Sequence, residues 1–243
     1  MNKLDEIAHY YKIEDDFDMV YMQHNFIVAQ DYFVGEKFLE LGCATGESTL
    51  ASMHFAKQID VVEGSPVNID ITKKKVEAQN MPAVTVNFQE AYWEDFSFEE
   101  NSYSDVLFFR GLEHLKDPAP VMKNIFKALK PGGRCHIVVP NANSLHRKIG
   151  VNMGLLKEVH ELNDRDKSVG HERVFDLYTL LETVKSFDFE VVDWRGVMLK
   201  VLSNGQMQEL CKDNENLIKG FFEVGKELPD RCAELYMAIT PKK

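Results

Sequence analysis

The sequence predicts an α/β fold with a mostly parallel sheet, because short apolar runs alternate along the chain with segments of helical pattern. Residues 38–41 and 59–62 are the first two runs, each short enough for a strand buried on both faces. Between them the chain turns at Gly42 and Gly46 and then resumes a helical pattern, and Glu63 closes the second run. This order of strand, glycine turn, helix, strand and acid is typical of a nucleotide-binding βαβ unit.

Length and composition indicate one globular domain. The chain has 243 residues, of which 44% are hydrophobic, enough for a single core. Its four cysteines form no CxxC pair, which argues against a zinc site or a disulfide framework and for a reducing cytoplasm. No apolar run approaches the roughly 20 residues needed to span a bilayer, and the chain opens with charged residues rather than a signal segment.

The formal net charge of −11 argues against a nucleic-acid substrate, because proteins that bind phosphate backbones usually display a basic face. The longest basic run, residues 73–75, is typical of a solvated helix face. We therefore expect a small-molecule substrate, no nucleic-acid or membrane partner, and a cytoplasmic monomer or homodimer.

The glycine turn has chemistry suited to a charged ligand. Gly42 and Gly46 lack a Cβ, so the backbone can bend sharply there and approach a ligand closely. Glu40 is an acid inside an apolar strand and needs a partner, which a ligand ammonium group would supply. Glu63, at the end of the second strand, is suited to accept hydrogen bonds from ribose hydroxyls.

The segment ELGCATG at residues 40–46, followed by Glu63, resembles the class I S-adenosylmethionine-dependent methyltransferases. The segments at 110–115 and 129–133 (LKPGG) also resemble later motifs of this family, so the resemblance covers residues 38–140. Dinucleotide-binding dehydrogenases usually carry G-x-G-x-x-G, which is absent here. The resemblance implies a Rossmann-like, seven-stranded, mostly parallel sheet with an antiparallel last strand and helices on both faces.

The remaining segments fit one domain with four parts. Residues 1–36 read as a helical cap, either packed on the sheet or closing over the cofactor, and 37–140 as the cofactor-binding core. Residues 141–175 break the alternation with a polar stretch, which predicts a substrate-binding insertion, and 176–243 complete the sheet. The helix after the glycine turn is expected to run from about residue 48 to about residue 57. The other expected helices are 66–80, 118–130, 176–187 and 204–226, and the other expected strands are 84–88, 106–109, 134–139, 189–194 and 233–240.

The resemblance implies that the glycine turn, the ends of the second to fourth strands and the cap contact S-adenosylmethionine. An aromatic residue after the third strand, Tyr92 or Trp93, would cover the adenine. The candidate cofactor residues are Glu40, Gly42, Cys43, Ala44, Gly46, Glu63, Gly64, Ser65, Glu90, Ala91, Tyr92, Arg110 and Tyr11.

Methyl transfer needs the acceptor held in line with the methyl group and water excluded, but it needs no covalent nucleophile. The family's amide- and adenine-modifying members carry an (Asn/Asp)-Pro-Pro-Tyr motif after the fourth strand, where this chain has residues 110–113, RGLE. Some metal-dependent relatives carry Glu-x-x-Glu-His there. This chain retains Glu113 and His114, but Arg110 replaces the first acid, so we expect no metal.

Arginines in three loops at the expected carboxyl edge of the sheet suggest an anionic acceptor, such as an acidic or sugar-like metabolite, because an arginine fork binds carboxylate or phosphate bidentately. The alternative is that each arginine pairs with a nearby acid. The candidate substrate residues are Tyr21, His24, Arg110, Asn141, Asn143, Arg147 and Arg173.

A histidine could accept the proton of a hydroxyl acceptor, since an unperturbed imidazole titrates near pH 6.5. We favour His171, which follows the flexible Gly170, then His146 and then His114. The alternative for each is a hydrogen bond to loop backbone. The expected function is methyl transfer from S-adenosylmethionine to an oxygen or nitrogen of a small molecule, with S-adenosylhomocysteine as product. The alternatives are a catalytically silent binding protein and a metal-assisted O-methyltransferase.

Overall fold

A seven-stranded sheet forms the centre of the molecule, in a computed structural model that describes residues 16–242. The strand order is β3-β2-β1-β4-β5-β7-β6, and β7 runs antiparallel to both of its neighbours. The expected fold class is therefore confirmed. The strands are β1 (Lys37–Leu41), β2 (Gln58–Glu63), β3 (Thr85–Glu90), β4 (Tyr103–Phe109), β5 (Leu129–Pro140), β6 (Phe189–Leu199) and β7 (Cys232–Pro241).

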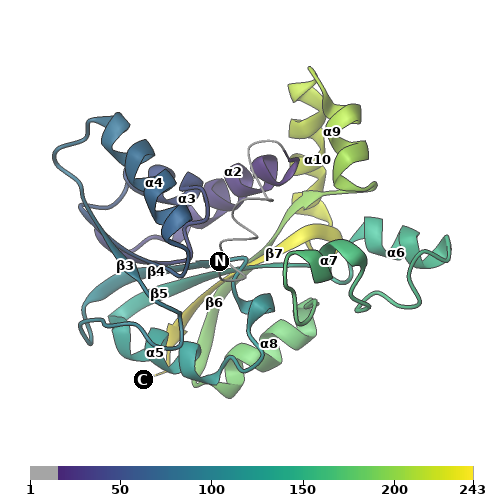
Figure 1. The fold of residues 1–243 in the computed structure, drawn as a ribbon. Helices are drawn as coiled ribbons and strands as arrows, with labels where there is room; N and C mark the ends of the chain where they lie inside the picture. The colour runs from purple at the N-terminus through teal and green to yellow at the C-terminus, as the bar shows by residue number, and fades with distance from the viewer. Residues whose placement is uncertain (1–15, 243) are drawn as a thin grey trace.

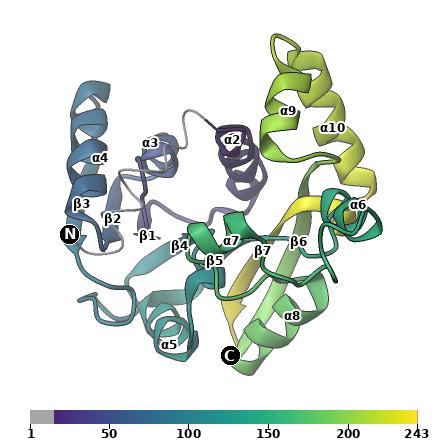
Figure 2. The same ribbon diagram turned by 45° about the vertical axis from the view of Figure 1, so that its right-hand side comes forward.

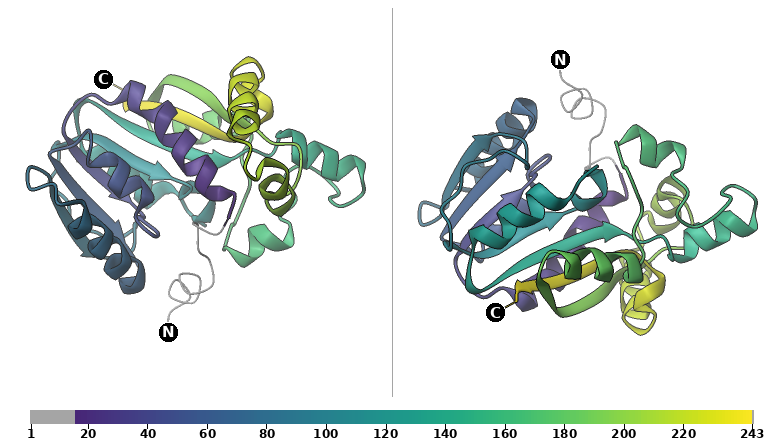
Figure 3. Two further views of the ribbon diagram at one scale, coloured as in Figure 1. Left: turned by 90° about the horizontal axis from the view of Figure 1, so that it is seen from above. Right: turned by 90° about the horizontal axis from the view of Figure 1, so that it is seen from below.

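Helices cover both faces of this sheet, as Figures 1 and 3 show. One face carries α2 (Asp18–Ala29), α3 (Glu47–Ser52), α4 (Pro66–Gln79), α9 (Asn204–Cys211) and α10 (Glu215–Glu227). The other carries α5 (Ala119–Ala128) and α8 (Leu177–Ser186). The apolar residues of each layer pack on opposite sides of the strands, which produces two hydrophobic clusters separated by the sheet.

Several elements differ from their expected lengths for local reasons. The helix after the glycine turn ends at Ser52 rather than near residue 57. The single helix expected over 204–226 is two helices, because Asp213 adopts a left-handed φ of +55° and Asn214 caps α10 through the backbone N–H of Leu217. Conversely, β6 continues to Leu199, since it pairs with β7 along its length.

The insertion expected at 141–175 extends past the carboxyl ends of the strands (Figure 2). It contains α6 (Leu145–Asn152) and the short α7 (Asp164–Ser168), and it rejoins the sheet through a bridge between Asn141 and Phe175. Residues 16–242 also contain three short 3₁₀ turns: η2 (Gln30–Tyr32), η3 (Leu112–His114) and η4 (Pro229–Arg231).

The described part of the N-terminal cap packs on the sheet, which is one of the two roles weighed for it, while closure over the cofactor stays a prediction. Phe17, Tyr21 and Phe26 are buried in the hydrophobic layer, so α2 packs on the sheet beside β6 and β7. The start of the same helix, at Asp18, also lines a cleft at the sheet edge. Within residues 16–242, no helix is long and apolar enough to cross a membrane.

Candidate cofactor and acceptor site

A cleft of about 990 Å³ opens at the carboxyl ends of the parallel strands. Its walls come from the glycine turn after β1, the ends of β2, β4 and β5, the residues after β3 and β6, the start of α2, and the insertion around α7. Ligands of open α/β sheets bind at this edge, because the strand order reverses there and the loops diverge. One half of the cleft is bounded by the glycine turn and the other by polar and charged side chains.

The glycine turn is held in a conformation that requires glycine. Gly42 and Gly46 have φ values of +86° and +94°, in the left-handed region. A Cβ on Gly42 would lie 2.8 Å from the Trp93 ring, and one on Gly46 would lie 2.9 Å from Thr72 Cγ2. The backbone therefore stays close to both neighbours, and the missing Cβ of Gly42 makes room for the Trp93 ring beside the cleft.

Glu63 joins the end of β2 to this turn. One carboxylate oxygen accepts hydrogen bonds from the backbone N–H groups of Cys43 (3.2 Å) and Ala44 (3.3 Å), and the other accepts from the N–H of Ser65 (2.8 Å). Burial raises the pKa of Glu63, and the three backbone hydrogen bonds oppose that rise. The carboxylate lines the cleft beside the turn, and its contact with a ribose stays a prediction.

Eight of the expected cofactor residues line the cleft. They are Gly42, Cys43, Ala44, Glu63, Gly64, Ala91, Tyr92 and Arg110. Trp93 lines it as well, with its ring edge-to-face on Phe108 at 5.3 Å between centroids, so the position after β3 presents a fixed aromatic ring. Tyr92 is 59% exposed, which leaves Trp93 the better supported of the two as a cover for an adenine.

Four other expected cofactor residues are not in the lining, for identifiable reasons. Glu40 is buried under the turn and accepts hydrogen bonds from the hydroxyls of Ser48 and Thr49, which satisfy it without a ligand ammonium group. Gly46 faces Thr72. Ser65 caps α4, and Glu90 is exposed. Tyr11 lies outside the described residues.

The buried position of Glu40 predicts a pH effect on stability. Burial raises its pKa to about 7, against the opposing hydrogen bonds of Ser48 and Thr49. In the unfolded chain the carboxyl ionises near pH 4.5, so the folded state binds more protons between the two values and stability falls as the pH rises through that window. Relative to Glu40→Gln, the wild type should lose about 2–3 kcal/mol of unfolding free energy between about pH 4.5 and about pH 7. Urea unfolding of both proteins measures this, and a constant difference would contradict it.

Three charged residues that were not predicted from the sequence, Asp18, Lys200 and Glu234, join Arg110 in the inner wall of the cleft. Arg110, with a left-handed φ of +52°, contacts Asp18 at 3.1 Å and Glu234 at 3.3 Å. Lys200 donates to Asn204, and burial lowers the pKa of Lys200 to about 8. The sequence feature that could have revealed this group is Glu234, an acid within the apolar run of the last strand.

The three arginines expected to gather around an anion are held separately, which makes that expectation wrong. Arg110 is paired with carboxylates in the inner wall. Arg147 is 4% exposed and donates to Asp166 at 3.0 Å and to two backbone carbonyls of the insertion. Arg173 donates to the carbonyls of Leu115 (2.6 Å) and Lys116 (2.8 Å). All three serve to fix local structure.

The other expected substrate residues divide between the cleft and the scaffold. Tyr21 lines the cleft with a buried hydroxyl that has no hydrogen-bond partner among the described residues. Asn141 also lines it, but its amide donates to the carbonyls of Asp230 and Cys232, which gives it a structural role. His24 packs against the ring of Phe222 at 4.4 Å and is absent from the lining, as is Asn143.

His146 lines the cleft but is poorly suited to act as a base. Burial, together with the charges of Lys200 and Arg147, lowers its pKa to about 2. A base that weak gains little from taking a proton at neutral pH. The second of the three candidate bases is therefore disfavoured by its environment.

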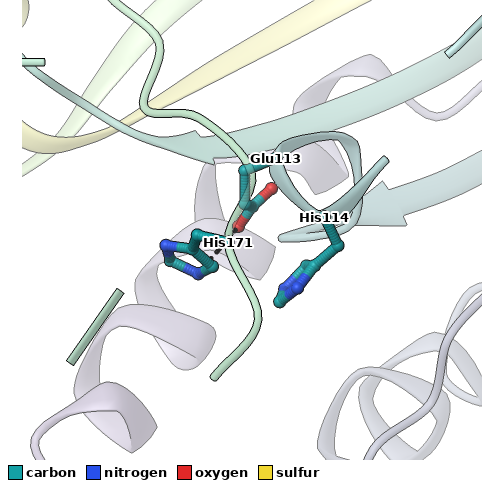
Figure 4. A group of neighbouring side chains, drawn as sticks. All are labelled: Glu113, His114 and His171. Atoms are coloured by element: carbon teal, nitrogen blue, oxygen red, sulfur yellow. Dashed lines mark ion pairs between the residues drawn. The ribbon is translucent and has the colours of Figure 1, made fainter. Parts of the chain in front are cut away.

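His114 and His171 line the cleft. Their side chains lie close to that of the buried Glu113, as Figure 4 shows. One ligand-type atom from each of the three lies within 4.8 Å of the other two. His171 Nε2 is 3.9 Å from a Glu113 oxygen, and the two rings lie edge-to-face with centroids 4.8 Å apart. Burial raises the pKa of Glu113 to about 7 and lowers that of His114 to about 4. The expectation of no metal considered Arg110, Glu113 and His114, and it did not include His171.

The insertion positions His171. Its Nδ1 lies 3.2 Å from Asp166, and the backbone N–H of His171 donates to the Asp166 carbonyl at 2.8 Å. Asp166 in turn closes a capping box with Asn163 at the start of α7 and pairs with Arg147. Arg147, expected to bind substrate, thus acts through Asp166 on the histidine.

Comparison with known proteins agrees with this geometry. A family model described as a methyltransferase domain matches residues 23–193. The O-methyltransferase cnsE of Penicillium expansum is 31% identical over 106 residues, which cover 41% of this chain and 36% of that protein. The chain therefore spans well under half the length of this curated relative.

Solved structures share the fold. A methyltransferase from Mesorhizobium loti, described as S-adenosylmethionine dependent, matches with a TM-score of 0.59 and 13% identity over 92% of this chain and 99% of that one. The [4+2]-cyclase SpnF matches with a TM-score of 0.61 and 16% identity, covering 91% and 81%. At these identities the likeness establishes architecture alone.

Proposed function

Because the chain belongs to the class I S-adenosylmethionine-dependent methyltransferases, we propose that it transfers a methyl group from that cofactor to a hydroxyl oxygen of a small molecule, leaving S-adenosylhomocysteine. The observation that carries the proposal is the continuous cleft, which joins the glycine turn and Glu63 to His114 and His171. Nitrogen is the alternative acceptor.

The residues of the cleft fit the cofactor. Gly42 keeps the turn free of a side chain, and Glu63 supplies a carboxylate, an acceptor suited to hydroxyl donors. Trp93 offers a ring of fixed orientation, because it packs on Phe108. When bound, S-adenosylmethionine supplies an electrophilic methyl group on a sulfonium.

The other half of the cleft would hold the acceptor. The walls around Tyr21, Arg110 and His171 would bound the space for the acceptor and hold it in line with the methyl group. The hydroxyl proton must leave as the new bond forms, and the group around His171 stands where that change of charge would be stabilised.

Glu63→Ala tests the cofactor half. We expect cofactor affinity to fall by about 1–3 kcal/mol, because a charged hydrogen-bond acceptor for the ribose is lost. Calorimetric titration with S-adenosylmethionine measures the change. Glu90→Ala is the matched control, since Glu90 is an exposed acid at the end of the neighbouring strand and should leave the affinity unchanged. Equal affinities for Glu63→Ala and wild type would refute the ribose assignment.

The transfer reaction is tested with methyl-labelled cofactor and fractionated small-molecule extract. Label should appear in a small-molecule fraction with the wild type and fall strongly with Glu63→Ala. Tight cofactor binding without label transfer from any fraction would favour the silent binding protein instead. Failure to bind S-adenosylmethionine would overturn the proposal altogether.

A further inference from the structure

We infer that Glu113, His114 and His171 bind a divalent metal ion of the zinc type, and that the acceptor hydroxyl joins it as a further ligand. The metal site stands on the geometry of the three side chains, whereas the role of the hydroxyl rests on the proposed function.

Glu113 is the first argument. Its side chain is fully buried, yet neither carboxylate oxygen has a hydrogen-bond partner among residues 16–242. Burying a carboxylate without partners is costly, and buried charges are normally paired or coordinate metals. The charge of the nearby Arg110 lowers the pKa of Glu113, but Arg110 is also paired with Asp18 and Glu234, so it is shared among three carboxylates. A cation between Glu113 and the histidines would supply the missing partner.

The second argument is the hydrogen bonding of the imidazoles. His114 Nδ1 lies 3.2 Å from the carbonyl of Gly170, which can only accept, so Nδ1 carries the proton. His171 Nδ1 bonds in the same way to the carboxylate of Asp166 at 3.2 Å. In both rings Nε2 is left with its lone pair. Histidines that bind metals characteristically donate their other N–H to a carbonyl or carboxylate.

The third argument is the spacing. Ligand atoms about 2.1 Å from a tetrahedral ion are about 3.4 Å apart, whereas these three atoms lie within 4.8 Å of one another. Closing the site requires movements of roughly 1 Å, which rotation of the Glu113 side chain on the short turn η3 can provide.

The ligand types select the kind of ion. Two imidazoles and one carboxylate suit Zn²⁺, Co²⁺ or Fe²⁺, whereas Mg²⁺ and Ca²⁺ prefer all-oxygen sites. Two histidines and one glutamate with an open position form a known type of catalytic zinc site. His114 and His171 line the cleft, so an open position would face the space for the acceptor.

The ion would act as a Lewis acid and undergo no redox change. Its charge lowers the pKa of the bound hydroxyl, whose proton passes to water in the cleft. The oxygen lone pair then forms a bond to the methyl carbon while the carbon–sulfur bond breaks. The sulfur keeps that electron pair and becomes a neutral thioether. In this account His171 binds the metal and does not accept the proton. This role replaces the general base expected from the sequence.

The test is titration of the full, chelator-treated protein with Co²⁺ alone, followed by calorimetry and visible absorption. We expect about one Co²⁺ per chain, with the absorption of a low-symmetry nitrogen and oxygen site. Glu113→Gln and His171→Gln should weaken binding by at least about a hundredfold, since each removes a ligand. The control is His160→Gln, an insertion histidine whose side chain is 40% exposed and 3.3 Å from Asp176, which should bind like wild type.

Thermal unfolding shows whether a variant that does not bind Co²⁺ is still folded. Co²⁺ should raise the Tm of wild type and His160→Gln but not that of Glu113→Gln, because an ion stabilises only a fold that binds it. Equal Co²⁺ affinity in wild type, Glu113→Gln and His171→Gln would overturn the metal site. S-adenosylmethionine calorimetry on the same samples separates the two proposals. If the protein binds the cofactor but not Co²⁺, only the metal site is refuted. If it binds Co²⁺ but not the cofactor, only the methyltransferase function is refuted.

Discussion

His171→Gln is expected to lower kcat by about a hundredfold or more while the affinity for S-adenosylmethionine changes little. His171 Nε2 lies 3.9 Å from Glu113, and Asp166 fixes the orientation of the ring. Removing a metal ligand or a base next to the acceptor typically costs this much, because the charge on the reacting oxygen loses its stabilisation. Single-turnover kinetics with an acceptor found by the label screen would measure it.

His146→Ala is the informative comparison. It lies in the same cleft, but its pKa of about 2 leaves it without a proton-accepting role, so we expect a loss of less than tenfold. A loss below tenfold in His171→Gln would show that the acceptor is activated elsewhere. A weakened affinity for S-adenosylmethionine in the same variant would show instead that the insertion shapes the cofactor half of the cleft.

The cofactor half could be predicted from sequence because its parts are close in the chain. The order from Glu40 to Glu63 gives a strand, a turn that needs glycine, a helix and a second strand, and parallel pairing of β1 and β2 then places Glu63 beside the turn. Four of the expected residues lie outside the lining of the cleft, and the partner expected for Glu40 was wrong. The charge of Glu40 pointed to a ligand, but the hydroxyls of Ser48 and Thr49, in the first turn of α3, satisfy it.

The acceptor half was less predictable because its contacts join distant segments through an irregular insertion. Hydrophobic periodicity specifies which face of a helix is buried, but not which loop residues meet. Glu113 and His171 come together through long-range contacts, such as the hydrogen bond from the backbone N–H of Glu172 to the Glu113 carbonyl at 2.9 Å. Likewise, Arg147 looked like a substrate arginine because the sequence does not show that the insertion folds back over it.

Arg147→Met should destabilise the insertion strongly, because Arg147 holds an acid and two backbone carbonyls of the insertion together. Its guanidinium is 3.0 Å from Asp166, donates to the carbonyls of Val159 and Glu161, and is almost fully buried. Removing one partner of a buried ion pair typically costs about 3–5 kcal/mol, because the other charge is left without compensation.

Hydrogen exchange of the backbone amides in α7 and at His171 measures this loss where it occurs, and urea unfolding gives the global value. The matched control is Arg195→Met, whose exposed ion pair with Asp193 should contribute about 1 kcal/mol or less. Similar effects from both substitutions would contradict the structural role of Arg147. If Asp166 positions His171 as its hydrogen bond indicates, Arg147→Met should also weaken Co²⁺ binding, whereas Arg195→Met should not.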